Sequence, residues 1–230
     1  MERVKSGIPG LDELTGGGLP RNHLILVTGT SGTGKTVFGT QFVYTGVKRF
    51  RENSVYLSFE EPAETIAENA KGFGWDFKEL ERQGKFTFIK YDPYHIEDVF
   101  DILESEIRNI KATRVVVDSI SALGLHVRDD AELRRMIFNL SLALRKLSCT
   151  SIIISEIVPG TRGLSRYGVE EFVADGVIVL YYERIETSFA RTLHVWKMRG
   201  SKHSEKLHPY KIDTSGITVY PEEEAFMKER

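Results

Sequence analysis

The sequence predicts an α/β fold: a mostly parallel, twisted β-sheet with helices on both faces and a C-terminal antiparallel hairpin. Short, continuously apolar segments alternate with segments of helical periodicity, which is typical of parallel sheets covered on both sides. From Asp175 onward this alternation stops, and two apolar segments follow each other without a helix between them. Because 230 residues suffice for one sizeable α/β domain, we expect residues 1–230 to form a single domain.

The first half of the chain provides the first alternating elements. A short helix is predicted at 8–14, and the glycines at 16–18 that follow it end the helix. Pro62 begins a later helix, because its fixed φ and missing N–H suit a first helical turn. The other predicted elements are a buried strand at 23–28, a helix at 36–50, a strand at 55–59 and a short strand at 86–89.

The second half continues the pattern and then departs from it. Apolar residues at helical spacing predict a helix over 96–110, and those from Leu133 to Leu147 predict a second one. Buried strands are predicted at 114–118 and 151–155, and the final hairpin is formed by 176–182 and 191–198.

The composition excludes several classes of protein. A net charge of −2 gives no overall electrostatic reason to bind nucleic acid or an anionic membrane. No segment reaches the roughly 18–20 apolar residues that cross a bilayer, and the charged first residues do not resemble a signal peptide. We therefore expect a cytoplasmic protein without a membrane partner. The single cysteine, Cys149, excludes an internal disulfide framework and is expected to be a small buried apolar residue.

Residues 29–36, Gly-Thr-Ser-Gly-Thr-Gly-Lys-Thr, match the phosphate-binding pattern G-x-x-x-x-G-K-[ST] between a predicted strand and helix. In this setting the N–H groups of the loop and the helix N-terminus face one anion. Lys35 would contact the β- and γ-phosphates, and the Thr36 hydroxyl would bind Mg²⁺. The other expected phosphate-binding residues are Thr30, Ser31, Gly32, Thr33 and Gly34. A chance match in a glycine-rich turn is the alternative, and the strand–loop–helix setting argues against it.

Carboxylates end two of the predicted strands. Asp118 lies where a P-loop protein needs a second acidic group to hold magnesium opposite Thr36, although a strand-terminal Asp can also cap a turn. Glu60 and Glu61 could face the γ-phosphate, where a carboxylate orients and deprotonates the attacking water. Alternatively, the two glutamates are a solvated acidic pair whose negative charge complements the dipole of the following helix. The spacing leaves both the catalytic and the structural interpretation open.

A basic segment occupies 197–203. On a strand, Lys197 and Arg199 would share one face, with Trp196 and Met198 on the other. Two cations that project together, followed by Gly, Ser and His, could clamp a phosphate. The alternative is the basic surface of an edge strand, where lysine protects against unwanted pairing. From the residues alone, the edge-strand interpretation is favoured.

In combination, these segments resemble the KaiC family of RecA-like P-loop ATPases, over nearly the whole chain. The resemblance is carried by the P-loop, Phe59-Glu60-Glu61, the strand ending at Asp118, Arg-Tyr-Gly-Val-Glu-Glu-Phe at 166–172 and Lys-Met-Arg-Gly-Ser-Lys-His at 197–203. It implies a homo-oligomer, a hexameric ring with ATP or ADP and Mg²⁺ bound between neighbouring subunits. It also implies that Glu60 is the general base, with Glu61 beside it.

The same resemblance assigns Lys197 and Arg199 to the site of the neighbouring subunit, where they would stabilise charge on the γ-phosphate, with Ser201 and His203 assisting. In the autophosphorylating half of clock KaiC, adjacent Ser and Thr occupy the positions of Glu171 and Phe172. The resemblance therefore implies a slow, regulatory or scaffolding ATPase without autokinase activity on segment 161–175.

Two other functions remain as alternatives. A relative of recombinases and ring helicases would bind single-stranded DNA through the loop at 158–171, which offers Arg162, Arg166 and Tyr167. A nucleotide-binding switch would bind ATP or ADP without turnover.

Overall fold

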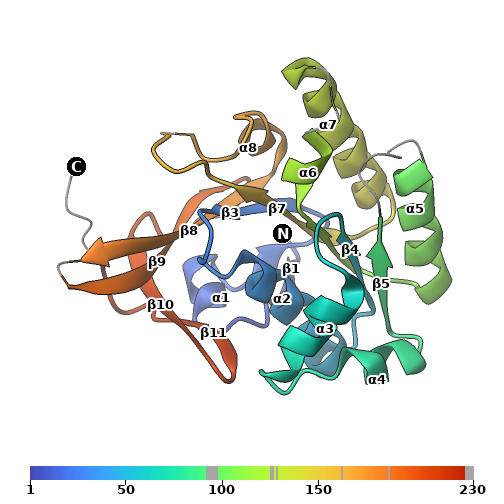
Figure 1. Cartoon of the computed structure of the whole chain (residues 1–230), viewed down its shortest axis with the longest axis horizontal. Coiled ribbons are helices and arrows are strands. Elements are labelled where there is room, and N and C mark those ends of the chain that lie inside the picture. Colours follow the sequence, from blue (N-terminus) through green and yellow to red (C-terminus); the bar gives the residue numbers. More distant parts are fainter. Residues whose placement is uncertain (92–97, 125–126, 128, 162, 186, 226–230) are drawn as a thin grey trace.

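The structure is a computed structural model that describes residues 1–91, 98–124, 127, 129–161, 163–185 and 187–225. The strands of its main sheet are β3 (Leu24–Gly29), β4 (Ser54–Ser58), β5 (Phe86–Lys90), β6 (Arg114–Asp118), β7 (Thr150–Glu156), β8 (Gly176–Ile185), β9 (Ser188–Met198), β10 (Leu207–Asp213) and β11 (Gly216–Val219). Within the described residues, these nine strands lie in the order β11-β10-β9-β8-β3-β7-β6-β4-β5 (Figure 1).

The strands from β8 to β5 in this order are parallel to their neighbours, whereas β9, β10 and β11 pair antiparallel. The predicted mostly parallel sheet with a C-terminal antiparallel hairpin is confirmed. The antiparallel part extends beyond that hairpin, because β10 and β11 continue it. A separate small sheet is formed by β1 (Arg3–Val4) and β2 (Leu19–Pro20).

Helices cover both faces of the main sheet (Figure 1). One layer contains α1 (Leu11–Leu14), α2 (Lys35–Phe50), α3 (Ala63–Lys71) and α4 (Phe77–Arg82), and the other contains α5 (Val99–Ile110), α6 (Ile120–Gly124), α7 (Asp130–Lys146) and α8 (Glu170–Val173). Consecutive residues of β3 point to opposite faces, so Ile25 belongs to one apolar core and Leu26 to the other. Among the described helices, none is long and apolar enough to span a membrane.

The predicted strands and helices are present in the structure, with the following differences. The helix expected from residue 96 is described from Val99, and Ile96 lies outside the described residues. The prediction that Trp196 and Met198 share a face is wrong. The register of β9 shifts between the partners of Val177 and Ile178, so Trp196 bulges out and is 52% exposed while Met198 is buried. The short helices α4, α6 and α8 and the strands β1, β2, β10 and β11 were not predicted.

The end of α2 is fixed by a buried cation, Arg114. Its guanidinium donates to Glu52 Oε2 at 2.7 Å, to the Phe42 carbonyl at 2.9 Å and to the Lys5 carbonyl at 2.8 Å. The aromatic rings of Phe42 and Phe50 lie 4.5 and 5.2 Å from it. Arg114 thus ties β6, the P-loop helix and the N-terminal segment to one another.

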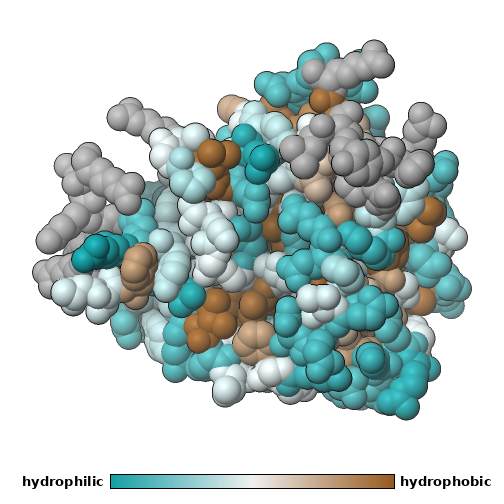
Figure 2. Space-filling model, viewed as in Figure 1, coloured by the Kyte–Doolittle hydropathy of each residue, from teal (hydrophilic) through white to brown (hydrophobic). Residues whose placement is uncertain are grey.

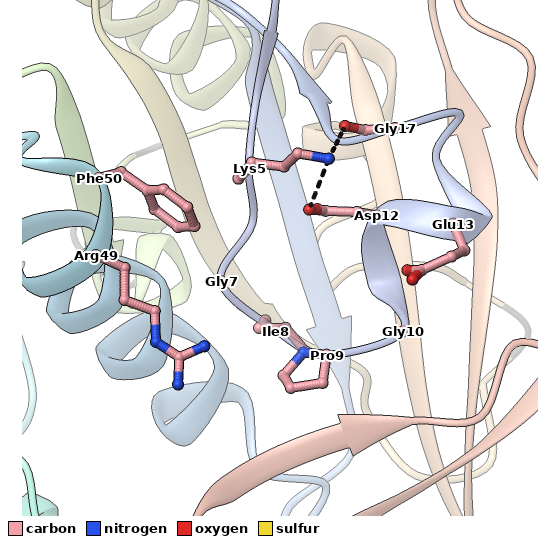
Figure 3. A pocket seen from close by; sticks show the side chains of 10 residues that line it. All are labelled: Lys5, Gly7, Ile8, Pro9, Gly10, Asp12, Glu13, Gly17, Arg49 and Phe50. Atoms are coloured by element: carbon pink, nitrogen blue, oxygen red, sulfur yellow. Dashed lines mark hydrogen bonds and ion pairs between the residues drawn. The ribbon is translucent and has the colours of Figure 1, made fainter.

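A hollow of about 460 Å³ lies beside the N-terminal segment (Figure 3). Lys5 crosses it to bond with the Gly17 carbonyl and pair with Asp12, while Arg49 and Phe50 line the other side. These two residues belong to the last turn of α2, whereas the P-loop precedes its first turn. The hollow is therefore separate from the predicted nucleotide site. Figure 2 shows that the face it views is mostly hydrophilic, with apolar residues in small separate patches.

Candidate functional site

The P-loop joins the carboxyl end of β3 to the first turn of α2. Gly32 and Gly34 have φ angles of +81° and +90°, which favour glycine. A Cβ on Gly34 would also come within 2.4 Å of Ile212 Cδ1. The buried Thr33 closes the loop by donating its hydroxyl to the Thr30 carbonyl at 2.9 Å. The shape of the loop therefore depends on its glycines and on β10 beside it.

Lys35 lies inside this loop. Its ammonium donates to the carbonyls of Gly29 and Thr30, each at 3.0 Å. Burial lowers the pKa of Lys35, and the carboxylates of Glu156, Asp118 and Glu60 oppose this shift. A phosphate oxygen is a stronger acceptor for an ammonium than a carbonyl, so these contacts can be exchanged for a bound phosphate.

Asp118 and Thr36 meet at the mouth of the loop. Asp118 Oδ2 accepts hydrogen bonds from the Thr36 hydroxyl at 2.9 Å and from the Tyr56 hydroxyl at 2.6 Å. Burial raises the pKa of Asp118 to about 6, against the effect of these two hydrogen bonds. The carboxylates of Glu60 and Glu61 raise it further. A cation at this position would favour the ionised form of Asp118.

The donor set fits magnesium that arrives with a nucleotide. Among the described residues, no group of three or more His, Cys, Asp or Glu side chains could hold a metal by itself. Mg²⁺ typically binds one or two carboxylates together with substrate phosphates and water. Thr36 and Asp118 provide two such oxygens, and phosphate oxygens would have to provide others.

Both predicted glutamates line the same pocket. Its volume is about 310 Å³, and its lining includes Lys35, Thr36, Glu60, Glu61 and Asp118. Both glutamates are exposed, but Glu60 Oε1 also accepts a hydrogen bond of 2.5 Å from the hydroxyl of Ser119, the residue after Asp118. The structure thus brings the P-loop, the expected metal ligands and both acidic residues together, and it ties Glu60 to the metal side of the site.

The sequence reasoning missed four residues of this region. Glu156 ends β7 and lines the pocket, so the strand-end argument used for Asp118 would have found it. The Tyr56 hydroxyl holds Asp118, and Lys90 donates to the carbonyls of Phe59 and Glu60 at 2.7 and 2.9 Å. Arg191 donates to the Gly32 carbonyl at 3.2 Å and lies 4.2 Å from the ring centre of Tyr182. Arg191 therefore links β9 to the P-loop.

The predicted cations point in a common direction. Lys197, the next-to-last residue of β9, donates to the Glu171 carbonyl at 2.6 Å. Arg199, just after β9, donates to the Phe172 carbonyl at 3.0 Å and lies 3.6 Å from Asp175 Oδ1. Burial lowers the pKa of Lys197, and the nearby Arg199 lowers it further. Both cations are therefore held against α8.

The register of the sheet separates these cations from the P-loop of the same chain. Gly29, at the P-loop, is level with Leu180, whereas Met198 pairs with Gly176 at the other end of β8. Four residues along a strand correspond to about 13 Å, and β9 also lies two strands from β3. Neither cation lines the P-loop pocket.

Ser201 and His203 also lie away from the P-loop. The Ser201 hydroxyl accepts from Arg3 at 2.7 Å and donates within the same loop, and His203 Nδ1 lies 3.0 Å from the Ser204 carbonyl. The backbone N–H of Ser204 in turn donates to the Leu14 carbonyl. This loop therefore lies against the N-terminal segment, next to the two cations in sequence.

The loop that could have bound single-stranded DNA makes contacts within the protein. Arg166 pairs with Glu156 at 3.0 Å, and the Tyr167 hydroxyl donates to the Ser121 carbonyl at 3.1 Å. Arg162 lies outside the described residues. These contacts tie the loop to β7 and α6, while Arg166 is exposed and its guanidinium lies 6.0 Å from the centre of the Tyr167 ring.

Comparison with known proteins agrees with this geometry. A sequence model of the KaiC ATPase family matches residues 4–224. A UPF0273 protein of Methanocaldococcus jannaschii is 40% identical over 239 residues, which cover 96% of this chain and 98% of that protein. The circadian clock protein KaiC3 of Synechocystis is 37% identical over 233 residues, covering 96% of this chain but 46% of KaiC3.

A crystal structure of a KaiC-like protein from Pyrococcus horikoshii superposes with a TM-score of 0.88 at 38% identity, covering 96% of this chain and 99% of that one. The RecA-like fold is therefore shared with a KaiC-like protein of similar length. With the family model matching nearly all of it, the chain belongs to the KaiC family of nucleotide-binding ATPases.

Proposed function

We propose that residues 1–230 form one magnesium-dependent ATPase domain whose catalytic sites lie between neighbouring subunits of a homo-oligomeric ring. One observation carries this proposal. The P-loop pocket contains candidates for phosphate binding, metal binding and proton abstraction, while Lys197 and Arg199 lie at the opposite end of the strands. A site that uses all of these groups needs two copies of the chain.

Each residue has a defined task in this proposal. The loop from Thr30 to Thr36 binds the phosphates through its N–H groups, and Lys35 moves from the loop carbonyls to phosphate oxygens. Thr36 and Asp118 would hold magnesium, which would supply charge neutralisation on the phosphates. Glu60 orients a water molecule and accepts its proton, while Ser119 holds the glutamate in place.

The neighbouring subunit contributes the cations. Lys197 and Arg199 stabilise the charge that develops on the γ-phosphate, and the adjacent loop with Ser201 and His203 borders the same site. A cation of this kind is worth about 10³–10⁵ in rate. Hydrolysis therefore depends on assembly. The ring of six subunits, and a regulatory or scaffolding role with slow turnover, rest on the family resemblance.

The proposal includes no autokinase activity on segment 161–175. Neither Glu171 nor Phe172 offers a hydroxyl to the γ-phosphate. Ser165 is buried, and its hydroxyl lies within hydrogen-bond distance of the carboxylates of Glu170 and Glu171, which share its one proton, while the Thr161 hydroxyl donates to the Val158 carbonyl. Incubation with γ-labelled ATP and peptide mapping tests this point, because label on 161–175 would contradict it.

Hydrolysis is tested by Glu60→Gln, with Glu61→Gln as the matched control. Loss of a general base lowers the rate by about 10²–10⁴, so Glu60→Gln should abolish turnover while ATP still binds. Glu61→Gln should retain most of the activity. Absence of turnover by the wild-type protein with magnesium at its working temperature would favour the non-hydrolysing switch instead.

A further inference from the structure

A buried carboxylate holds the element to which the two cations are bonded. Glu170, the first residue of α8, is fully buried. It accepts hydrogen bonds from the Ser155 hydroxyl at 2.9 Å and from the Val169 N–H at 3.1 Å, and the Ser165 hydroxyl, which it shares with the Glu171 carboxylate, lies 2.7 Å away. Burying a carboxylate is costly unless it is hydrogen-bonded. Its position is therefore fixed by these contacts.

Helix α8 depends on this anchor for its own position. It has four residues, and a helix of one turn is not stable without tertiary contacts. Its carbonyls at Glu171 and Phe172 are the acceptors for Lys197 and Arg199. A displacement of Glu170 would consequently move the groups that orient both cations.

The anchor is connected to the nucleotide pocket through two buried serines. Ser121 Oγ and Ser155 Oγ are 3.2 Å apart, and Ser121 Oγ accepts from the Glu156 N–H at 3.1 Å. Each hydroxyl has one proton, and that of Ser155 goes to Glu170, so Ser121 donates to Ser155. The hydrogen bonds therefore run in one direction, from the Glu156 backbone to the Glu170 carboxylate, and such chains polarise one another.

The end of this chain at Glu156 and Ser121 lies beside residues of the candidate site. Glu156 lines the P-loop pocket, and Ser121 follows by two positions Ser119, which is bonded to Glu60. The Ser119 carbonyl also accepts from the Ala122 N–H, so Ser119 begins the turn that carries Ser121. A change at the phosphate site has a continuous bonded route to α8.

We propose that Glu170 is the positioning residue for Lys197 and Arg199, and that the Ser121–Ser155–Glu170 chain couples a subunit's own nucleotide site to the cations it presents to its neighbour. This inference rests on the proposed intersubunit ATPase. Its consequence is that occupancy of one P-loop alters hydrolysis at the next site in the ring.

The positioning role is tested by Glu170→Gln, with Glu104→Gln in the exposed ion pair with Arg108 on α5 as the control. Misplacement of a catalytic group by about 1 Å can cost about 10²-fold in rate. Glu170→Gln should therefore lower kcat at least tenfold, with less than a twofold change in the KM for ATP and an unchanged ring mass. Glu104→Gln should stay within threefold of wild type.

A double-mutant comparison separates positioning from general damage. In a Lys197→Ala/Arg199→Ala background, Glu170→Gln should change the residual rate by less than twofold, because the groups it positions are absent. A tenfold loss in that background, or a wild-type kcat for Glu170→Gln alone, would overturn the positioning role. If the wild type turns over no ATP, or Arg199→Ala is fully active, the proposed function itself fails.

The coupling is tested in rings that contain two types of subunit. One type carries Arg199→Ala and has a normal P-loop. The other type, called the donor, keeps Lys197 and Arg199 and presents them to the P-loops of the first type. Two donors are compared. The Glu60→Gln donor should bind ATP at its own P-loop without hydrolysing it, and the Lys35→Ala donor should leave its own P-loop empty. The two donors should support rates that differ at least about fivefold. Adding Ser121→Ala to both donors should remove the difference. Equal rates from the original donors, or a difference that survives Ser121→Ala, would refute the coupling. If Glu170→Gln subunits do not assemble, this mixed-ring experiment decides alone.

Discussion

Cys149 shows how burial sets the chemistry of a single side chain. It is 1% exposed, and burial raises the pKa of its thiol to about 12. Cys149 lies between α7 and β7 in sequence, and its Sγ atom is 3.5 Å from the Ala112 carbonyl. The thiol therefore has a structural role, as expected from its position beside an apolar strand.

We predict that Cys149 of the folded protein does not react with iodoacetamide at pH 8. The thiolate is the reactive form, and a pKa raised to about 12 keeps the thiol protonated until far above this pH. Mass spectrometry of the native protein should show no adduct, while the protein unfolded in guanidinium at the same pH should be labelled. Stoichiometric labelling of the native protein would contradict the burial.

The residues at strand ends show what the sequence could predict about the site. Asp118, Glu60 and Glu61 were found because parallel strands bring their carboxyl ends to one edge, and all three line the pocket. Glu156 obeys the same rule and was overlooked. Tyr56 could not be found this way, because the partner of a buried hydroxyl is set by packing across two strands.

At the scale of elements, the P-loop provides a test of backbone conformation. Gly34→Ala should reduce nucleotide affinity at least tenfold, because the residue has φ +90° and its Cβ would meet Ile212 at 2.4 Å. Gly84→Ala is the matched control, with φ +65° and no atom within 4 Å of the added Cβ. Calorimetric titration with ATP and magnesium should show wild-type affinity for the control, and equal affinities for both variants would count against the strained-loop argument.

Arg114 should contribute more to stability than an exposed arginine in an equally short ion pair. Arg114→Met should lower the free energy of unfolding by about 3–5 kcal/mol, since it leaves the Glu52 carboxylate with the more distant Arg21 at 3.8 Å and leaves two carbonyls without the Arg114 donor. Arg108→Met, which removes the exposed pair with Glu104, should cost less than about 1 kcal/mol.

Urea unfolding measures both changes. The double variant Arg114→Met/Glu52→Gln should recover part of the loss, because no carboxylate then remains at position 52. Equal costs for Arg114→Met and Arg108→Met would show that the buried pair does not hold the end of α2.

The elements that the sequence missed have common physical features. β10 and β11 lie at the edge of the sheet, and β10 contains Pro209 and alternating polar residues, so neither resembles a buried parallel strand. α8 has four residues and no helical periodicity, and tertiary contacts through Glu170 define it. The bulge at Trp196 is likewise set by pairing with β8, which local sequence does not encode.

At the scale of the whole molecule, the separation of the P-loop from Lys197 and Arg199 predicts nucleotide-dependent assembly. Molar mass from light scattering should rise to that of a ring when ATP and magnesium are added, because bound nucleotide gives the cations of the next subunit an anionic partner. Arg199→Ala should need a higher ATP concentration to assemble. A monomeric mass at saturating ATP would contradict the shared site.

The measurement that tests the central claim most directly is the ATPase rate of a mixture of Glu60→Gln and Arg199→Ala subunits. Each variant alone should be nearly inactive, one lacking the base and the other the cation. In mixed rings, a P-loop from Arg199→Ala beside a neighbour carrying Glu60→Gln has both groups. About a quarter of the interfaces in a random equimolar ring are of this kind, so the mixture should recover about that fraction of the wild-type rate. A mixture as inactive as its components, despite verified subunit exchange, would contradict a site completed by a second subunit.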